Sequence, residues 1–370
     1  MSEHKAVRTR RVSLGGAGKN RRIDIGGGAP VSLQTMWKEG IVPVLTDQAA
    51  LTAVLARIDS LAQLGCGVVR FAVPDMPSAD ALNKIAGGSS LPVVADIHFD
   101  YRLALRCLEG DVAKIRINPG NIGSAERVRA VAERCREKGV PIRIGVNTGS
   151  LPADVAVRVQ GGDLDRAEAL VETALREAAA LDALNFQEII VSIKASGGEE
   201  TVRAARLFSS RSDIPLHIGV TEAGPLIGGI VRSTWAICTL LNEGIGDTVR
   251  VSLSSSPENE VIAGRAMLQE AGKRTGGVTL VSCPRCGREG FDVHGFMERW
   301  ERRLYGLKAD ITVAVMGCPV NGPGEAKHAD IGITGGGGTA VIFRHGAVVK
   351  RVPAAEADQA FAEALDALIV

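Results

Sequence analysis

The chain has 370 residues, of which 45% are hydrophobic and 23% charged, and its formal net charge is +1. Such proportions are typical of a globular protein, and the length suits one large domain followed by a small one. The balanced charge argues against nucleic acid or a membrane surface as the main partner, and the 4% of aromatic residues argues against a base-stacking platform.

The cysteines and the N-terminal region indicate a cellular compartment. Seven cysteines, an odd number, predict reduced thiols and not a disulfide framework. Residues 1–14 are basic but lack the apolar run of a secretory signal, and no apolar stretch is long enough to span a membrane. We therefore expect a cytoplasmic protein with no membrane segment.

From residue 31 onward, short Val- and Ile-rich runs alternate with stretches of helical periodicity, after a basic, Gly-rich lead-in or barrel floor over residues 1–30. The expected strands are Val31–Met36, Val68–Ala72, Val93–Ile97, Ala113–Ile117, Ile142–Val146, Ile189–Lys194, Leu216–Val220 and Thr248–Ser252. The expected helices are 47–64, 78–86, 101–109, 124–138, 153–182 with a break at Gly161-Gly162, 198–211, 226–243 and 258–272. Eight β–α units predict an α/β fold, a (β/α)8 TIM-type barrel, with a doubly wound open sheet as the alternative.

The pattern changes near residue 275. We expect strands at Val278–Ser282 and Ile311–Met316, a helix at 290–304, a four-glycine turn at 335–338, a hairpin (Ala340–Phe343 and Ala347–Lys350) and a last helix at 354–369. These elements predict a small α+β domain. The expected domains are therefore 1–275, the barrel, and 276–370.

Polar side chains gather at the carboxyl ends of the expected strands, where a barrel carries its chemistry. The set is Arg70, Asp96, His98, Arg116, Asn118, Arg143, Asn147, Lys194, His217, Thr221, Arg250 and Ser252. Charged side chains in apolar strands are costly to bury unless something neutralises them. Single members such as Asp96, or Lys114 two residues before Arg116, could be salt-bridged, but cations at five strand ends predict a small polyanion with two phosphates.

Glu222 is the exception, a carboxylate among cations just after the seventh expected strand. It could pair with an arginine, or it could act as a general acid–base, a role for which His98 and His217 are the other candidates.

Three cysteines stand in two proline-flanked segments, Cys283-Pro-Arg-Cys286 and Gly317-Cys318-Pro319. Thiolates on loops suit a soft metal or an iron–sulfur cluster. A zinc site completed by a histidine remains an alternative, whereas a redox dithiol would leave Cys318 without a role. Glu325 is within loop reach as a harder fourth ligand that could leave one iron open to substrate. The four upstream cysteines fit small core residues.

The chain resembles a known family over nearly its whole length. The matching segments are Gly65-Cys-Gly-Val-Val-Arg70, Ala95-Asp-Ile-His-Phe-Asp-Tyr-Arg102, Lys114-Ile-Arg-Ile-Asn-Pro-Gly-Asn-Ile-Gly123, Arg143-Ile-Gly-Val-Asn-Thr-Gly-Ser-Leu151, His217-Ile-Gly-Val-Thr-Glu-Ala-Gly224, Cys283-Pro-Arg-Cys-Gly-Arg288 and Met316-Gly-Cys-Pro-Val-Asn-Gly-Pro-Gly-Glu325. The family is that of the bacterial 4-hydroxy-3-methylbut-2-enyl diphosphate synthases of the methylerythritol phosphate route to isoprenoids.

The resemblance implies an iron–sulfur oxidoreductase that opens 2-C-methyl-D-erythritol 2,4-cyclodiphosphate reductively to (E)-4-hydroxy-3-methylbut-2-enyl diphosphate. Two electrons would arrive singly from flavodoxin or ferredoxin. The resemblance also implies a homodimer in which the cluster domain of one chain closes over the barrel of the other.

The same resemblance implies roles for individual residues. The ligands of a [4Fe–4S] cluster fall on Cys283, Cys286, Cys318 and Glu325, and the acid–base carboxylate falls on Glu222. The substrate-binding residues would be Arg70, Asp96, Arg116, Asn118, Arg143, Asn147, Lys194, His217, Arg250, Ser252 and Asn321.

One segment departs from the family pattern. The loop after the first barrel strand usually reads Gln-Ser-Met-Thr-Asn-Thr, whereas here Gln34-Thr-Met-Trp-Lys38 is followed by Glu39. This difference leaves the role of Trp37 and Lys38 open. Two rival interpretations of the chain are a non-catalytic phosphate-ligand-binding barrel with a structural zinc knob, and a pterin-binding barrel related to dihydropteroate synthase.

Overall fold

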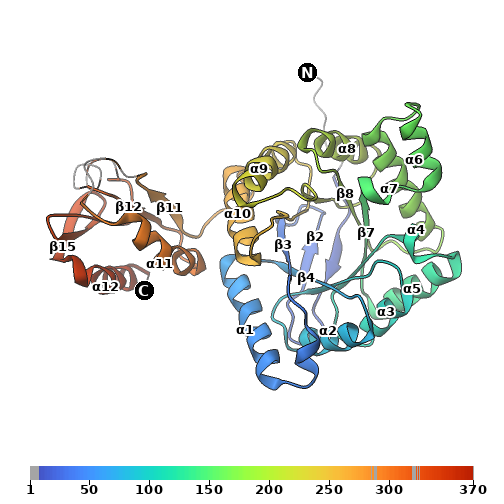
Figure 1. Cartoon of the computed structure of the whole chain (residues 1–370), viewed down its shortest axis with the longest axis horizontal. Coiled ribbons are helices and arrows are strands. Elements are labelled where there is room, and N and C mark those ends of the chain that lie inside the picture. Colours follow the sequence, from blue (N-terminus) through green and yellow to red (C-terminus); the bar gives the residue numbers. More distant parts are fainter. Residues whose placement is uncertain are drawn as a thin grey trace. The chain divides into compact units, whose positions relative to one another are not determined.

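The computed structural model describes residues 8–284, 286, 290–318, 322, 324 and 326–369. The chain forms two compact units, Met1–Arg274 and Thr275–Val370 (Figure 1).

Eight parallel strands form the inner ring of the first unit. They are β3 (Ser32–Met36), β4 (Val68–Ala72), β5 (Val93–Asp96), β6 (Lys114–Ile117), β7 (Ile142–Asn147), β8 (Ile189–Lys194), β9 (His217–Ile218) and β10 (Thr248–Val249). Their order is β8-β7-β6-β5-β4-β3-β10-β9, and a parallel bridge between Val191 and Leu216 connects the two ends. The expected (β/α)8 barrel is therefore confirmed, and the open-sheet alternative is wrong.

Helices surround this ring (Figure 1). They are α1 (Gln48–Leu64), α2 (Met76–Gly88), α3 (Tyr101–Cys107), α4 (Pro119–Ile122), α5 (Ala125–Lys138), α6 (Ala153–Gln160), α7 (Arg166–Asp182), α8 (Gly198–Arg211), α9 (Leu226–Asn242) and α10 (Pro257–Glu270), with short 3₁₀ turns at Val42–Leu45 and Thr148–Ser150. Side-chain caps fix several starts: the carboxylate of Asp47 accepts from the backbone N–H of Ala49. The expected break at Gly161-Gly162 separates α6 from α7, whereas α4 was not predicted.

A hairpin closes one end of the barrel. Strands β1 (Val12–Leu14) and β2 (Ile23–Ile25) pair antiparallel. Their apolar side chains pack against Val68, Val94 and Ile190, which lie at or next to the first residues of barrel strands. The hairpin is thus the floor at the amino ends of the strands, and the polar residues at the carboxyl ends lie at the opposite mouth.

The second unit contains a five-stranded mixed sheet. Strands β11 (Thr279–Ser282), β12 (Thr312–Val315) and β13 (Ile331–Gly336) are parallel, and β13, β14 (Thr339–Arg344) and β15 (Ala347–Pro353) pair antiparallel in that order. Helices α11 (Val293–Gly306) and α12 (Ala357–Ile369), the latter after a 3₁₀ turn at Ala354–Glu356, complete the unit. The α+β expectation is confirmed.

The expected four-glycine turn is partly wrong. Gly335 and Gly336 end β13, and only Gly337 and Gly338, both with positive φ, form the turn. The strand itself was not predicted. A Cβ at Gly332 would collide with the ring of Phe343 on β14, so this strand needs a glycine where a strand usually carries a side chain.

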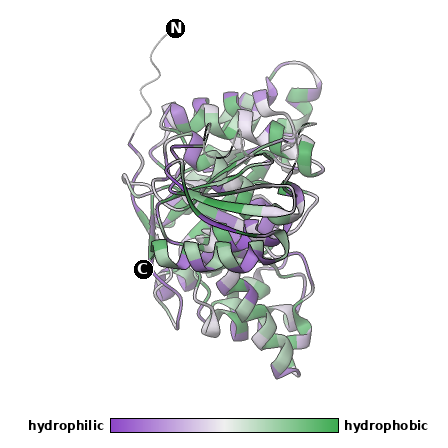
Figure 2. Cartoon of the chain, turned by 90° about the vertical axis from the view of Figure 1, so that its left-hand side faces the viewer, coloured by the Kyte–Doolittle hydropathy of each residue, from purple (hydrophilic) through white to green (hydrophobic). Residues whose placement is uncertain are grey.

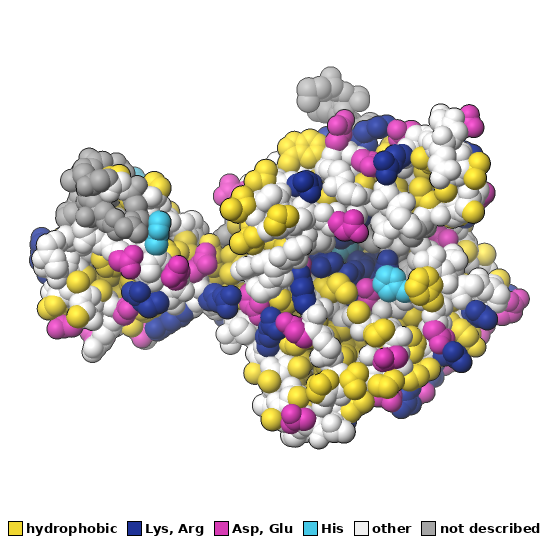
Figure 3. Space-filling view, viewed as in Figure 1, with side chains coloured by type: hydrophobic (Ala, Val, Ile, Leu, Met, Phe, Trp, Pro, Cys, Tyr) yellow, Lys and Arg dark blue, Asp and Glu magenta, His cyan; other side chains and the backbone are white. Residues whose placement is uncertain are grey.

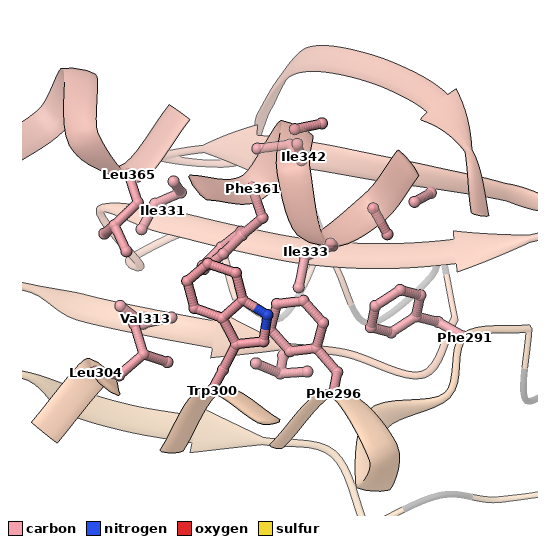
Figure 4. Close-up of a cluster of buried hydrophobic side chains, with 14 of the residues drawn as sticks. Phe291, Phe296, Trp300, Leu304, Val313, Ile331, Ile333, Ile342, Phe361 and Leu365 are labelled. Carbon is pink, nitrogen blue, oxygen red and sulfur yellow. The ribbon is translucent and has the colours of Figure 1, made fainter. Parts of the chain in front are cut away.

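An aromatic cluster forms the core of the second unit (Figure 4). The Phe296 and Trp300 rings of α11 stack with centroids 5.4 Å apart, and Phe361 of α12 meets both rings edge-on. Ile331, Ile333 and other buried strand residues complete this cluster. Helices α11 and α12 are thereby fixed to the sheet that carries the cysteine loops.

Hydropathy follows the same architecture. The strands are mostly hydrophobic, while the helices alternate hydrophobic and hydrophilic residues along their length (Figure 2). Among the described residues, no helix is both long and apolar enough to cross a membrane.

Candidate functional site

A cavity of about 210 Å³ lies at the carboxyl ends of the barrel strands. It is lined by Met36, Arg70, Asp96, His98, Arg116, Arg143, Gly145, Val146, Asn147, Ser192, Lys194, Thr221, Arg250 and Ser252. Figure 3 shows lysine and arginine side chains gathered in a hollow of this unit, with a histidine beside them. Eight of the predicted binding residues line this one cavity: Arg70, Asp96, Arg116, Arg143, Asn147, Lys194, Arg250 and Ser252.

Strand register explains how these side chains meet. In the parallel ladder, Asp96 is paired with Arg116, and Arg116 with Arg143, so three neighbouring strands present polar residues at one level. Asn147 and Lys194 are paired at the ends of β7 and β8. Residues of equal register on a closed barrel point to a common interior, so the fold converts separate sequence positions into one site.

Asp96 holds two of the arginines. Its Oδ1 accepts from Arg116 Nη1 at 3.1 Å, and its Oδ2 lies 3.5 Å from Arg70 Nε. Burial alone would raise the pKa of Asp96, but the charge of Arg70, the hydrogen bond with His98 and the charge of Arg116 outweigh it and hold that pKa well below its usual range. Asp96 is therefore an ionised anchor for the guanidinium groups.

Gly145 makes room for Arg116. A Cβ at Gly145 would lie 2.5 Å from Arg116 Nε and 2.7 Å from Nη2. No side chain could occupy this position unless the Arg116 guanidinium moved, so glycine on β7 is a packing requirement of the cavity.

Arg143 and Lys114 are buried cations with unsatisfied donors. Arg143 is 1% exposed, and its Nε and Nη1 have no hydrogen-bond partner among the described residues. Nζ of Lys114 is fully buried and also has no hydrogen-bond partner among the described residues. Burial, together with the charge of Arg143, lowers the pKa of Lys114 well below its usual value. The alternative that Lys114 is salt-bridged thus finds no support among the described residues. Buried donors without acceptors are rare, and an anionic ligand in the cavity would supply acceptors for those of Arg143.

Lys194 is also buried among positive charges. Burial, then the positive charges of Arg143 and Arg250, lower the pKa of its ammonium well below the usual value. Burial also lowers the pKa of Arg70 to about 10. These directions indicate a cavity that holds more positive charge than its own carboxylates compensate.

Glu260, which the sequence did not single out, is a further buried carboxylate and contacts an arginine of the cavity. It lies in the first turn of α10, and its oxygens accept from Arg250 Nε at 3.3 Å and Nη2 at 3.2 Å. Burial raises its pKa, but Arg250 and Lys38 outweigh that effect, so the net shift is downward. An acidic residue early in a helix is an ordinary sequence feature, so nothing in the pattern showed that this side chain points inward.

Two predicted binding residues lie near the mouth without lining the cavity. Asn118 is buried, and its Oδ1 accepts from the backbone N–H of Gly120 at 3.2 Å as the cap of α4. His217 is fully buried, with Nδ1 2.6 Å from Thr248 Oγ1 and with no partner for Nε2 among the described residues. Burial and the charge of Lys194 lower the pKa of His217 well below its usual value, so the ring is neutral.

Glu222 lies beside the cavity on strained backbone. It is solvent-exposed and has a φ of 49°, one of the few non-glycine residues with positive φ among those described. Its neighbour Thr221 lines the cavity. Such a conformation costs free energy and is common at functional positions.

Two of the predicted cluster ligands follow adjacent parallel strands in the second unit. Cys283 directly follows β11, Cys318 lies shortly after β12, and both are buried. The thiol of Cys283 packs with Met316, Ala326 and Ala329. The backbone N–H of Gly322 bonds to the carbonyl of Cys318, and that of Ala326 to the carbonyl of Gly322.

The remaining cluster positions are only partly described. Cys286 is exposed, while Glu325 and Asn321 lie outside the described residues. Within the described part, no three Cys, His, Asp or Glu side chains converge on a point where a metal could bind. Two buried thiols at neighbouring strand ends nevertheless fit the soft-donor chemistry of an iron–sulfur group.

All four upstream cysteines were expected in the core, which is confirmed for three of them and wrong for Cys238. Cys66, Cys107 and Cys135 are fully buried, and burial raises the pKa of Cys66 and of Cys107 to about 12. Cys238 is only half-buried.

The fold and the site together define a class: a (β/α)8 barrel with a cationic cavity at its strand ends, followed by a small α+β domain with cysteines at its own strand ends. Comparison of the sequence with models of known protein families then identifies the family. The GcpE TIM-barrel domain matches residues 10–265, and the GcpE protein C-terminal domain matches residues 279–367. The chain belongs to the GcpE family.

Similar proteins agree. The chain is 56% identical over 352 residues to the 4-hydroxy-3-methylbut-2-en-1-yl diphosphate synthase (flavodoxin) of Treponema pallidum, covering 93% of this chain and 86% of that protein. It is 51% identical to the protein of the same name from Treponema denticola, covering 95% and 94%. Among solved structures, Yersinia pestis dihydropteroate synthase aligns with 68% of this chain and 94% of that chain at a TM-score of 0.46 and 8% identity, too weak a likeness to bear on function.

Gly145→Ala should weaken anion binding because the added methyl displaces the Arg116 guanidinium. We expect the dissociation constant for inorganic pyrophosphate, measured by calorimetry, to rise about tenfold, the scale of one lost hydrogen bond to a charged group. Gly149→Ala is the matched control, because a Cβ there lies 3.7 Å from its nearest neighbour, Asn147 Oδ1. Equal affinity of the Gly145→Ala variant and the wild type would contradict the packing argument.

Anion binding should take up protons, because a bound anion raises the lowered pKa of Lys194. Methanedisulfonate resembles a diphosphate but does not titrate near neutral pH, so proton uptake reports on the protein. We expect calorimetric heats that differ between buffers of different ionisation enthalpy, and an affinity that falls as the pH rises. Lys194→Met should remove most of this dependence, and zero uptake by the wild type would show that Lys194 is already fully protonated.

Proposed function

We propose that this chain catalyses the reductive opening of 2-C-methyl-D-erythritol 2,4-cyclodiphosphate to (E)-4-hydroxy-3-methylbut-2-enyl diphosphate. The relatives bear the name of the synthase that forms this product, and they align with the chain over nearly their whole length. The structural observation that carries the proposal is the cavity with buried cationic donors, which suits a ligand with two phosphates.

The reaction sets what the protein must supply. The ring carbon–oxygen bond to the diphosphate breaks, and a hydroxyl leaves as water after it receives one proton. Two electrons are taken up, and they form the carbon–carbon double bond of the product. The substrate dianion thus becomes a product trianion, so positive charge at the diphosphate favours the ring opening.

The barrel residues would bind the cyclic diphosphate. Arg70, Arg116, Arg143, Lys194 and Arg250 line the cavity and would neutralise the two phosphates as negative charge increases. Asp96 would hold Arg70 and Arg116 in place. The other contacts we assign are Asn118, Asn147, His217, Ser252 and Asn321.

We assign a [4Fe–4S] cluster to Cys283, Cys286, Cys318 and Glu325 in the second domain. When bound, such a cluster supplies electrons one at a time to the carbon that loses oxygen. The support is the chemistry of the donors: Cys283 and Cys318 are buried thiols at adjacent strand ends, in loops that can aim their ligands. Substrate binding is accordingly assigned to residues 1–275 and electron transfer to 276–370.

We assign the proton to Glu222. The residue is exposed and has left-handed backbone, and its neighbour in the chain, Thr221, lines the cavity. The group would deliver a proton to the departing hydroxyl.

The proposal extends to partners and location. Flavodoxin, which appears in the names of the relatives, is the electron donor we assign, and ferredoxin is the alternative. A homodimer in which each cluster domain closes over the partner barrel would bring electrons to the substrate. The cytoplasm suits an enzyme that needs reduced thiols. A non-catalytic barrel with a zinc knob finds no support in relatives that are named as synthases.

Cys318→Ser should lose iron and turnover together, because a hydroxyl is a poor ligand for this cluster. Anaerobically purified wild type should be brown, and iron analysis, the visible spectrum and reduction of the cyclic diphosphate are the measurements. Cys238→Ser is the matched control, a half-buried cysteine of the barrel that should keep both iron and activity. A colourless, zinc-loaded and fully active wild type would contradict the assignment.

Glu222→Gln should keep the cluster and substrate affinity but lose turnover about 100-fold or more, the scale of general acid catalysis. The amide keeps the size and the left-handed backbone of the position but cannot deliver the proton. Steady-state kinetics with calorimetric substrate binding tests this, and the spectrum of the cluster controls for integrity. Undiminished turnover would remove Glu222 from the mechanism.

A further inference from the structure

The loop after β3 places a lysine against the buried carboxylate of Glu260. Lys38 Nζ donates to Glu260 Oε1 at 2.8 Å and to the backbone carbonyl of Leu253 at 2.5 Å. The Lys38 side chain is 29% exposed, whereas that of Glu260 is fully buried. This contact involves one of the two residues at which the loop departs most from the family pattern.

Glu260 joins the ends of two barrel strands. Besides Lys38 and Arg250, it accepts from Thr35 Oγ1 at 2.8 Å and from the backbone N–H of Leu253 at 3.1 Å. Thr35 belongs to β3, and Arg250 directly follows β10. One carboxylate thus balances two cations, so the group of three retains one positive charge.

Arg250 and Lys38 line one pocket together, but of the two only Arg250 lines the anion cavity. Arg250 lines the anion cavity and also a second pocket of about 420 Å³, whereas Lys38 lines only the second pocket, together with Trp37 and Phe71. Lys38 therefore has no direct place in the anion cavity. Its hydrogen bond to Glu260, which in turn holds Arg250, links it to that cavity.

We infer that Lys38 is a positioning residue for the anion site: it neutralises Glu260 so that the charge of Arg250 remains available to the ligand. Without Lys38, Arg250 would be the only cation on Glu260, and the pair would be neutral. Its attraction for an anion in the cavity would then fall, since charges interact strongly where water is excluded. The nature of the ligand, a diphosphate, rests on the proposed function.

The loop has other anchors that do not involve Lys38. Arg57 donates to Glu39 at 2.8 Å and to Glu258 at 2.7 Å, and its guanidinium lies 5.0 Å from the centre of the Trp37 ring. Trp37 is itself stacked on Phe71 at 5.3 Å. Removing the Lys38 ammonium should therefore leave the loop in position, which separates its charge from a role in folding.

The first experiment compares Lys38→Met with Lys38→Arg in the full-length, cluster-loaded protein. We expect Lys38→Met to weaken binding of the cyclic diphosphate about tenfold by calorimetry, as for one charged hydrogen bond, and to raise KM with kcat within about twofold of wild type. Lys38→Arg, which keeps the charge, should recover most of the affinity. Lys84→Met is the control, because Lys84 Nζ donates only to the carbonyl of Leu45 at 2.8 Å.

A double-mutant cycle with Glu260→Gln tests the route of the effect. If Lys38 acts through Glu260, then Lys38→Met changes affinity less than about twofold in the Glu260→Gln background. An equal loss in both backgrounds would show that Lys38 acts independently of Glu260 and would overturn the inference. If Glu260→Gln does not fold, the inference is tested by comparing Lys38→Met with Lys38→Arg. Equal affinity of Lys38→Met and the wild type for the cyclic diphosphate would then overturn the inference.

The two proposals fail in different ways. A wild type that does not bind the cyclic diphosphate overturns the proposed function and this inference with it. A wild type that binds and turns over the substrate, with a Lys38→Met variant of the same affinity, overturns only the inference.

Discussion

The barrel depends on one electrostatic constraint: several cations are buried at the strand ends with too few carboxylates to balance them. Asp96 and Glu260 are the counter-charges, and each holds its cations by direct contacts, Asp96 to Arg116 and Glu260 to Arg250. Burying unpaired charge is expensive, so the folded barrel has an excess of positive charge that a bound polyanion would neutralise. The lowered pKa of Lys194 has the same cause. The same excess of buried positive charge would therefore destabilise the free protein and favour binding of an anionic ligand.

The rest of the fold serves that constraint. The β1–β2 hairpin seals the amino ends of the strands with apolar contacts, so the polar ends face a single mouth. Glycine at position 145 gives the Arg116 guanidinium its space. The second unit repeats the principle, because Cys283 and Cys318 also follow parallel strands, β11 and β12. In both units the residues assigned to chemistry lie on parallel strands or shortly after them, so strand register decides which of them meet.

Much of this was predictable. Val- and Ile-rich runs separated by helical periodicity gave the eight barrel strands, and charged residues inside those runs pointed to Arg70, Arg116 and Arg143 because a cation in an apolar strand needs a reason. The misses have physical causes. Strand β13 contains three glycines, which a pattern based on side chains reads as a turn, and Gly332 is required by the ring of Phe343. Glu260 looked like any acidic residue in a first helical turn, and its inward direction depends on how α10 packs.

The sequence by itself determined the order of the elements, the barrel class and the chemical types available at the strand ends, because periodicity and charge placement are local properties of the chain. Only the tertiary structure decided which of those side chains share a cavity. Closure of the ring set Asp96, Arg116 and Arg143 at one level, placed Asn118 as a helix cap and left Glu222 exposed beside the mouth. It also brought Lys38 to Glu260, 222 positions away. Contacts across such separations depend on register and packing, which no local pattern encodes.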